Sequence, residues 1–364
     1  MHVVVVNPGS SSLKLHVLDD ADEIVASREV PVAGGRSGSD QVEAFLAAHP
    51  DVTAAGVRFV HGGPDLSEAV VVDQKVEDRL EAAADLAPLH DLPALDALRA
   101  VRRARPDVAV VACFDTAFFA RLPAAAATYA VPWRWIQQWG LRRFGFHGMS
   151  HASASRRAPR LLGVPAGGLR LVICHLGAGV SLAAVAGGTP VDTTMGFTPL
   201  DGLVMATRPG SVDPGLVLWV QRHGGLSVDD VERALYRESG LAGLSGASGD
   251  MREVIAAADA GNERAALALG VYLHRLRAGI ASMASAMGGF DAVVFTGGVG
   301  ENSSRVRGDA CSGLGFLGLA VDSERNAADD PGDRDIAAAG SGVPILVIRS
   351  REDQEIAREV RRLL

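Results

Sequence analysis

The chain of 364 residues is short of cysteine, which excludes a protein held together by a disulfide framework. Its three cysteines, Cys113, Cys174 and Cys311, lie far apart in the sequence and have no metal-binding spacing. Cys113 and Cys174 fall within apolar runs. We therefore expect buried free thiols and a cytoplasmic protein.

Long apolar runs and excess positive charge are also missing. No segment has about 18 consecutive apolar residues, and the N-terminus lacks the basic stretch that begins a signal peptide. The formal net charge is −8 and the isoelectric point is near 5.7, which disfavours a nucleic-acid-binding surface. These absences predict no membrane and no nucleic-acid partner, and they leave small molecules as the expected partners.

Lysine is scarce too, because only two of the 35 basic side chains are lysines, Lys14 and Lys75. Lys14 lies in VVVVNPGSSSLKLHVL, where two expected strands flank a turn longer than a hairpin needs. The turn gathers the polar side chains of Asn7, Ser10, Ser12 and Lys14 beside a glycine, an arrangement that suits a phosphate group. The polar tip of an ordinary hairpin is the alternative interpretation.

The chain does have a regular alternation of apolar runs and helical patterns, which is typical of α/β layers. Its length predicts two domains. Strands are expected over residues 3–6, 12–18, 56–60, 108–113, 170–174, 180–186, 292–296 and 344–348. Helices are expected over residues 77–86, 93–104, 214–223, 228–237, 263–287 and 353–363, with Asp91 capping the second.

An internal repeat adds to this pattern. Residues 169–196, LRLVICHLGAGVSLAAVAGGTPVDTTMG, repeat the opening sequence of strand, glycine-rich break and further strands. Two such copies indicate a duplicated domain with a nucleotide in the cleft between them, although chance similarity is the alternative. A third glycine cluster, FDAVVFTGGVGENSSRVR, ends a strand at Gly297 and Gly298 and predicts a helix that starts at Glu301 or Asn302.

Ten stretches spread over the whole chain carry a more specific signal. They are VNPGSSSLKL, VRFVHGG, LAPLH, FDTAF, RRFGFHGMSH, CHLGAGVSLAAV, MGFTPLDGLVMATRPGSVDP, SGASGDMREV, FTGGVGENS and EDQEIAREV. In this order they resemble the acetate and propionate kinase family, which belongs to the larger group of sugar kinases, actin and the Hsp70 ATPases.

This resemblance implies a duplicated RNase H-like α/β fold of the actin, Hsp70 and sugar-kinase type, with the active site in the cleft between two domains. The first would comprise residues 1–149, completed by the helix at 350–364, and the second residues 150–349. Such proteins are homodimers, although the apolar periodicity of residues 263–287 fits burial within a domain as well as a dimer contact.

The reaction implied is a reversible, Mg²⁺-dependent transfer of phosphate between ATP and acetate or another short-chain carboxylate, giving ADP and acetyl phosphate. Three alternatives remain open. They are a propionate- or butyrate-type kinase, a kinase with another phosphoryl donor, and a non-catalytic ATP-binding switch of the actin or Hsp70 type.

Phosphoryl transfer asks a protein chiefly for positioning and charge stabilisation, and forked guanidinium groups suit carboxylate and phosphoryl oxygens. Arg58 ends an apolar strand and Arg208 lies in a Gly/Pro-rich turn, although either alone is more often a surface charge. The resemblance implies that Arg58 binds the acyl substrate and that Arg208 and His147 steady the transferring group. Asp115, which could also be a helix cap, is expected to orient the acyl site and magnesium-bound water, because acetate is already ionised at pH 7.

Two histidine motifs have competing interpretations. His147 and His151 are spaced like zinc ligands, but the glycines around them disfavour a regular helix and no third ligand is near, which favours a phosphate-facing imidazole. His175 begins the second glycine-rich turn, where a nucleotide phosphate or simple burial in the core would explain it.

The resemblance assigns the remaining roles. It implies that Asn7 and Glu352 are the protein ligands of magnesium. The wall around a short acyl tail is assigned to Val60, Leu89, Phe146 and Pro199, with core packing as the alternative. The nucleotide-contacting positions it implies are Ser10, Ser12, Lys14, His175, Leu176, Gly177, Ala178, Gly179, Asp250, Met251, Arg252, Gly298, Val299, Gly300, Glu301 and Asn302.

The chain departs from the family pattern at several places. Ala178 stands where an asparagine is usual, Asp91-Leu92 where Asn-Pro is favoured, and Phe119 where a histidine is usual. The segment between Leu18 and Arg58 is also shorter than expected. These differences bear on nucleotide affinity, turnover and acyl preference more than on the class of reaction.

Overall fold

The computed structural model describes residues 1–9, 12–31 and 38–364, without the side chains of residues 88, 89 and 166. Of the predicted site residues, Ser10 and the side chain of Leu89 therefore lie outside the described part. The chain divides into two compact units. Unit 1 consists of Met1–Ala120, Phe146–Ser153 and Arg351–Leu364, and unit 2 consists of Arg121–Gly145 and Ala154–Ser350.

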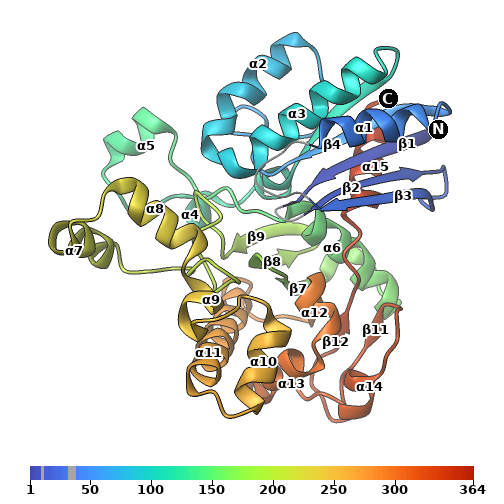
Figure 1. Ribbon diagram of the computed structural model, residues 1–364. Helices are drawn as coiled ribbons and strands as arrows, with labels where there is room; N and C mark the ends of the chain where they lie inside the picture. Colours follow the sequence, from blue (N-terminus) through green and yellow to red (C-terminus); the bar gives the residue numbers. More distant parts are fainter. Residues whose placement is uncertain (10–11, 32–37) are drawn as a thin grey trace. The chain divides into compact units, whose positions relative to one another are not determined.

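Unit 1 contains a six-stranded sheet with the order β3-β2-β1-β4-β6-β5 (Figure 1). The first three strands along the chain form an antiparallel meander, whereas β1, β4 and β6 run parallel, and β5 pairs antiparallel with β6. The strands are β1 (His2–Pro8), β2 (Ser12–Leu18), β3 (Ile24–Pro31), β4 (Val52–Phe59), β5 (Val70–Val71) and β6 (Ala109–Phe114).

Unit 2 contains a second six-stranded sheet, with the order β9-β8-β7-β10-β12-β11. The first three of its strands again form an antiparallel meander, β7, β10 and β12 run parallel, and β11 pairs antiparallel with β12. The strands are β7 (Arg170–Leu176), β8 (Val180–Ala186), β9 (Thr189–Thr193), β10 (Ala292–Thr296), β11 (Arg334–Asp335) and β12 (Ile345–Val347).

The two sheets therefore share one topology, strand for strand and direction for direction. This confirms the predicted duplication and the RNase H-like α/β fold. All eight predicted strands are present, and β9 follows the Gly187-Gly188 hairpin of the predicted repeat, but β3, β5 and β11 were not predicted as separate strands. β3 is mostly exposed and gives no apolar alternation, and the other two have only two residues each.

Alternation along β1 explains how unit 1 is layered. Val4 and Val6 belong to the core beneath α1 (Ser39–Ala47) and α3 (Pro88–Ala104), while Val3 and Val5 belong to a second core beneath α15 (Glu352–Leu363). Successive strand residues point to opposite faces, so a run of four valines supplies both cores. The helix at the end of the chain thus completes the unit that the beginning of the chain starts (Figure 1).

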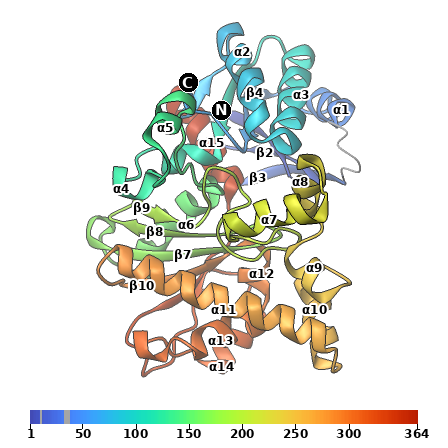
Figure 2. The same cartoon turned by 90° about the vertical axis from the view of Figure 1, so that its left-hand side faces the viewer.

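In unit 2 the long helix α11 (Glu263–Ala286) packs on the sheet (Figure 2). Five of the seven apolar positions read from its sequence are buried, which confirms that the pattern serves the core: Leu269, Leu273, Leu276, Ile280 and Met283. Ala266 is exposed and Met287 is half-buried. Gly279 allows the close approach, because a Cβ atom there would lie 2.8 Å from a methyl group of Leu182 in β8.

The remaining helices are shorter. None of the helices in residues 1–9, 12–31 and 38–364 is long and apolar enough to cross a bilayer. They are α2 (Gln74–Ala83), α4 (Ala124–Ala127), α5 (Trp133–Trp139), α6 (Gly148–Leu162), α7 (Pro214–Gly224), α8 (Val228–Arg237), α9 (Gly240–Ser245), α10 (Met251–Asp259), α12 (Gly297–Asn302), α13 (Ser304–Ser312) and α14 (Ser323–Ala327), with 3-10 turns at Ala84–Leu86, Asp115–Phe119, Ala166–Gly168 and Gly315–Leu317.

The three cysteines are buried free thiols, as predicted. Cys113 lies in β6, Cys174 in β7 and Cys311 in α13. Burial raises the pKa of all three thiols, that of Cys311 to about 12. They therefore stay protonated and unreactive at neutral pH.

Two local predictions are wrong. Asp91 does not cap a helix, because α3 already begins at Pro88 and the carboxylate of Asp91 bonds to backbone outside that helix. The helix after β10 begins at Gly297, and Glu301 and Asn302 lie in its last turn rather than at its start. Their side chains bond back to the first turn, since the Glu301 carboxylate accepts from the Gly297 N–H and the Asn302 amide donates to the Gly298 carbonyl.

The packing of α15 on β4 gives a first prediction. Ile356 is fully buried, and a Cβ atom added at Gly56 would lie only 2.4 Å from its Cγ2 atom, so the contact is tight. Ile356→Ala leaves a cavity and should lower the free energy of unfolding by about 2–5 kcal/mol. Urea denaturation followed by circular dichroism measures this, with exposed Arg358→Ala on the same helix as the control. Equal midpoints for the two variants would show that α15 does not hold the unit 1 core together.

Candidate functional site

Four polar side chains of unit 1 converge where the parallel strands end. Asn7 lies near the end of β1, Arg58 near the end of β4, Asp115 directly after β6, and Glu352 at the start of α15. Because β1, β4 and β6 run parallel as neighbours, their carboxyl ends meet at one edge of the sheet. The fold thereby brings together four side chains that are distant in sequence.

Arg58 is the centre of this group. Its Nε and Nη2 atoms donate to the two carboxylate oxygens of Asp115, at 3.2 and 2.6 Å, in a bidentate pair. Its Nη1 atom donates to Oδ1 of Asn7 at 3.0 Å and lies 3.6 Å from Oε2 of Glu352. The guanidinium group is thus held at three points by oxygen atoms.

The electrostatics keep this arginine charged. Burial alone would lower the pKa of Arg58, but the charges of Asp115 and Glu352 outweigh it and raise that pKa. Asp115 is 1% exposed, and burial raises its pKa while the ion pair with Arg58 opposes the rise. The guanidinium group of Arg58 therefore stays charged, and its planar fork could bind another carboxylate only if that carboxylate took the place of Asp115.

The predicted magnesium ligands touch each other. Nδ2 of Asn7 donates to Glu352 at 3.1 Å and to Asp353 at 3.4 Å, and His16 bonds to Asp353 at 2.8 Å. Burial would raise the pKa of Asp353, but the bond to His16 and the positive charge nearby lower it. In the described part of the chain no three His, Cys, Asp or Glu side chains are arranged to hold a metal. The amide oxygen of Asn7 and the carboxylate of Glu352 are oxygen donors of the kind that Mg²⁺ binds, and Mg²⁺ takes one or two protein ligands and several waters.

The predicted acyl wall of unit 1 adjoins this cluster. Val60 follows β4, and the next residue, His61, packs edge-on against Phe146 with 5.5 Å between ring centroids. Gly148 lies so close to Asp115 that a Cβ atom would be 1.9 Å from the Asp115 carbonyl oxygen, so only glycine fits. His147, with a φ of 58°, precedes that contact. Phe146 and His147 are therefore brought to the same end of the sheet as Arg58.

Phe119, one of the departures from the family pattern, is fully buried and packs edge-on against His151 at 5.6 Å. His151 is also fully buried, one turn into α6. The sequence spacing of His147 and His151 thus places one before the helix and one within it. Neither belongs to a group of metal ligands in the described residues.

Asp91 has a role that sequence reasoning missed. Its carboxylate is 1% exposed and accepts the backbone N–H of Val60 at 2.8 Å and that of His61 at 3.2 and 3.3 Å. Burial raises the pKa of Asp91 to about 7, although these two hydrogen bonds act in the opposite direction. The family departure at this position is therefore a buried carboxyl group that ties α3 to the end of β4.

In unit 2 the two glycine-rich segments lie side by side. A Cβ atom at Gly297 would be 2.8 Å from the carbonyl oxygen of Leu176, so the turn after β10 rests on the end of β7. Gly177 donates to the carbonyl of Gly179 at 2.9 Å, which closes the turn between β7 and β8. The predicted nucleotide positions at 175–179 and 298–302 therefore form one surface.

A third segment of unit 2 joins them. The N–H of Ala206 donates to the carbonyl of Ala178 at 3.0 Å, and a Cβ atom at Gly249 would lie 2.6 Å from the carbonyl oxygen of Ala206. Asp250 caps α10 and pairs with Arg252, which lowers the pKa of Asp250 to about 2. Ser12 and Lys14 of β2 belong to unit 1, where Lys14 lies opposite Asn7.

Arg208 lies two residues after Ala206 in the sequence. Its Nη1 atom donates to the carbonyl of Pro199 at 2.8 Å. Among the described residues Arg208 forms no ion pair, and burial lowers its pKa. Even so, an arginine remains protonated at neutral pH. A largely buried guanidinium held by a carbonyl alone has donors available for an anion.

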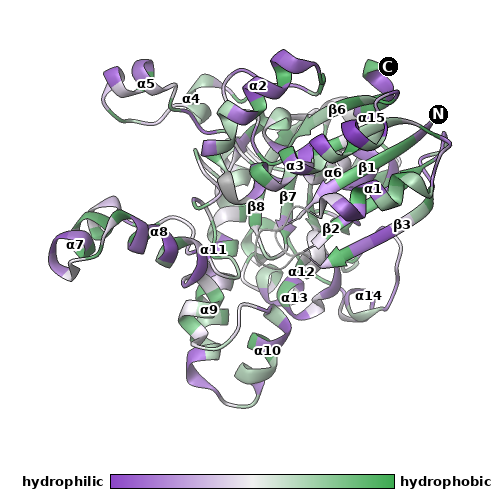
Figure 3. Cartoon of the chain, turned by 45° about the horizontal axis from the view of Figure 1, so that its top comes forward, coloured by the Kyte–Doolittle hydropathy of each residue, from purple (hydrophilic) through white to green (hydrophobic). Residues whose placement is uncertain are grey.

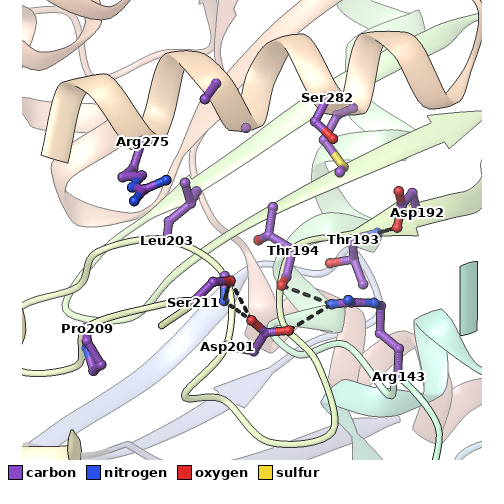
Figure 4. Close-up of a pocket in the computed structure, with 14 residues that line it drawn as sticks. Arg143, Asp192, Thr193, Thr194, Asp201, Leu203, Pro209, Ser211, Arg275 and Ser282 are labelled. Carbon is purple, nitrogen blue, oxygen red and sulfur yellow. Dashed lines mark hydrogen bonds and ion pairs between the residues drawn. The ribbon is translucent and has the colours of Figure 1, made fainter. Parts of the chain in front are cut away.

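A cavity of about 380 Å³ lies beside this loop (Figure 4). Nη1 of Arg143 donates to the carbonyls of Thr194 and Met195, at 3.0 Å each, and to Asp201 at 3.3 Å. Ser211 donates to the same aspartate at 2.6 Å. These bonds fix both ends of the loop that carries Pro199 and Arg208. Sequence reasoning did not single out Arg143 or Asp201, although both lie in the quoted motifs.

Comparison with known proteins identifies the family of the chain. The model of the Acetokinase family matches residues 39–358. The acetate kinase of Gloeobacter violaceus is 49% identical over 317 residues, 86% of this chain and 77% of that protein. The acetate kinase of Nostoc punctiforme is 41% identical over an alignment of 405 residues that covers all of both chains.

Solved structures match over the full length. A Porphyromonas gingivalis acetate kinase has a TM-score of 0.90 at 32% identity, covering 100% of this chain and 99% of that one. A propionate kinase from Francisella tularensis has a TM-score of 0.92 at 32% identity, covering 100% of both. The fold and these matches define a kinase with duplicated RNase H-like units. The chain belongs to the Acetokinase family.

The raised pKa of Asp91 gives a second prediction. A carboxyl group with a pKa of about 7 in the folded state and 3.8 ordinarily binds its proton more tightly when folded, so stability falls as pH rises from about 4 to 7. Asp91→Asn removes this loss and should raise the melting temperature more at pH 8 than at pH 5, by a free-energy difference of at most about 3 kcal/mol. Asp96→Asn, an exposed aspartate on the same helix, is the control. A shift that does not depend on pH would contradict the assignment.

Proposed function

We propose that this protein is an acetate kinase, which reversibly transfers the γ-phosphoryl group of ATP to acetate and gives acetyl phosphate and ADP. The observation that carries the proposal is the Arg58 guanidinium, buried at the strand ends and already paired bidentately with a carboxylate. The named relatives support acetate as the acceptor.

Asp115 shows how the acceptor would be held. An acetate ion presents the same two oxygen atoms that Asp115 presents to Arg58, so it competes with Asp115 for the guanidinium group. Acetate is ionised at pH 7 and needs no general base. Asp115 would therefore orient Arg58, and it would accept the hydrogen bonds of the Arg58 guanidinium when no acetate is bound. Val60 and Phe146 would limit the length of the acyl tail.

The residues of unit 2 would hold the nucleotide. The backbone N–H groups of residues 176–179 would face the phosphates, and Ala178 contributes no side-chain donor there. Arg208, which has no carboxylate partner in the described part, would neutralise charge on the transferring group, with His147 as a second donor. When bound, Mg²⁺ would supply charge neutralisation at the phosphates, with Asn7 and Glu352 as its protein ligands.

A propionate kinase is the second candidate, favoured by the full-length match to the Francisella enzyme. A coupled assay of ADP formation with acetate, propionate and butyrate, and of phosphate transfer from ATP and from pyrophosphate, separates the candidates. The highest kcat/KM with acetate and ATP is expected. No turnover with any carboxylate would contradict the proposed function and leave the non-catalytic switch.

Arg58 and Arg208 give a third prediction, because they are assigned different parts of the reaction. Arg58→Ala removes an interaction present before and during transfer and should raise the KM for acetate at least tenfold. Arg208→Ala removes an interaction with the transferring group and should lower kcat by about 10²–10³. Steady-state kinetics measure both, with exposed Arg358→Ala as the control. An unchanged acetate KM in the Arg58 variant would refute its role.

We further propose that the protein is a cytoplasmic homodimer with two domains; residues 121–145, which the sequence prediction places in the first domain, belong to compact unit 2. α5, α7 and α8 contain no buried residue, and α7 carries hydrophobic residues along its exposed turns (Figure 3). Half of the strongly exposed large apolar side chains of the described part lie in residues 131–139 and 212–228. Helices this short are not stable on their own in water, so a partner surface is needed.

The size of this surface supports a second copy as the partner. Trp133, Trp135, Trp139 and Trp219 are 64, 39, 55 and 60% exposed. At about 200 Å² for each tryptophan they expose roughly 400 Å², half of what each partner buries in a stable interface.

The surface gives a fourth prediction. Trp219→Asp should convert the dimer to a monomer in sedimentation velocity at micromolar concentration, because a charge would have to be buried. Phe316→Asp, at an aromatic residue that is 78% exposed outside this surface, should leave the dimer intact. A wild-type protein that sediments as a monomer would refute the homodimer.

A further inference from the structure

The segment after β4 is held by side chains from other parts of unit 1. The N–H groups of Val60 and His61 donate to Asp91 on α3, and the N–H of Gly62 donates to the hydroxyl of Thr116 at 3.1 Å. Val60 is the first residue of this segment and Arg58 lies two residues before it in β4, and both are assigned to the acyl substrate. Its backbone position therefore determines where those two side chains lie.

Asp91 is suited to this task only when it is ionised. A carboxylate offers both oxygen atoms as acceptors, and here one accepts at 2.8 and 3.3 Å and the other at 3.2 Å. A protonated carboxyl group loses the charge that strengthens these bonds and gains an O–H donor. Leu89 is two residues before Asp91 in the first turn of α3, so the same carboxylate ties Val60 to the turn that carries Leu89.

Charged groups of unit 1 influence the titration of Asp91. Asp115 acts to raise the pKa of Asp91 and Arg58 acts to lower it, while burial has the largest effect and brings that pKa to about 7. Two further titratable residues adjoin Asp91: His90 precedes it on α3, and the fully buried His61 donates its backbone N–H to it. The charge of Asp91 thus changes in the neutral range, among groups that bind the substrate.

We propose that Asp91 is a positioning residue for the acyl substrate, whose ionised carboxylate fixes Val60 against the first turn of α3 and so sets the shape of the acyl pocket. The proposal rests on the proposed function and adds to it a residue that has no contact with the transferring group. It places acyl binding under the control of pH between about 6 and 8. Phosphate-binding residues of unit 2 are not part of this linkage.

The expected behaviour separates KM from kcat. When the pH falls from 8 to 6, Asp91 gains a proton, the two N–H bonds weaken, and the KM for acetate rises roughly three- to tenfold while kcat changes much less. In Asp91→Asn the amide oxygen still accepts hydrogen bonds but does not titrate, so the KM stays flat over this range. Asparagine carries no buried charge, and the variant is expected to fold.

The experiment measures acetate KM and kcat from pH 6 to 8.5 with saturating ATP and Mg²⁺, for wild type, Asp91→Asn and Asp96→Asn. A rising KM on acidification in wild type and Asp96→Asn, absent from Asp91→Asn, supports the proposal. A KM that falls on acidification, is flat in wild type, or keeps its inflection in Asp91→Asn overturns it and leaves the acetate kinase assignment standing. If no carboxylate is turned over, the proposed function itself fails. In that case the acetate-induced rise in melting temperature at pH 6 and pH 8 tests the proposal directly, and equal rises at both pH values refute it.

Discussion

The charged edge of unit 1 depends on a single geometric constraint, that neighbouring parallel strands end together. β1, β4 and β6 deliver Asn7, Arg58 and Asp115 to one place, and α15 adds Glu352. The bidentate pair of Arg58 and Asp115 makes this arrangement tolerable in a buried position, because each charge offsets the cost of burying the other. Removal of either partner would leave an uncompensated charge at the strand ends. The residues proposed to bind the acyl group and magnesium lie around that pair.

The duplication places different residues at equivalent positions of one topology. In unit 1 the ends of β4 and β6 carry the charged side chains of Arg58 and Asp115, whereas in unit 2 β10, the counterpart of β4, ends in the glycine-rich turn of Gly297 and Gly298. Gly297 has a φ of 77° and lies against the backbone of Leu176, so backbone groups rather than side chains form that surface. Side chains select a small carboxylate by charge and shape, while exposed backbone N–H groups suit phosphates. The two sheets have the same topology, and the two units differ in the residues at the ends of their strands.

Much of this arrangement could be predicted from sequence because it follows from local pattern. Runs such as Val3–Val6 identify buried strands, and arginine or aspartate directly after such a run identifies Arg58 and Asp115 as strand-end residues. Asp91 could not be predicted in the same way. An aspartate near a helix start usually is a cap, and its actual partners, the N–H groups of Val60 and His61, come from a distant strand. Arg143 and Asp201 were missed for a similar reason. They form an ion pair between residues that are far apart in the sequence, and no hydrophobic periodicity marks such a pair.

The position of α15 has a consequence for the order in which the protein is assembled during synthesis. Val3, Val5, Ala54 and Cys113 share their core with Ile356 and Val360, which are made after all of unit 2. Ribosomes add roughly 5–20 residues per second. The apolar face of the first sheet therefore stays uncovered for on the order of ten seconds or more, until α15 has been synthesised. Unit 2, apart from residues 121–145, is made in one stretch that ends at Ser350, before that helix is available. The nascent chain therefore exposes a strip of valine and alanine throughout the synthesis of unit 2. We expect a chaperone to bind the N-terminal half of the chain, where this apolar strip lies.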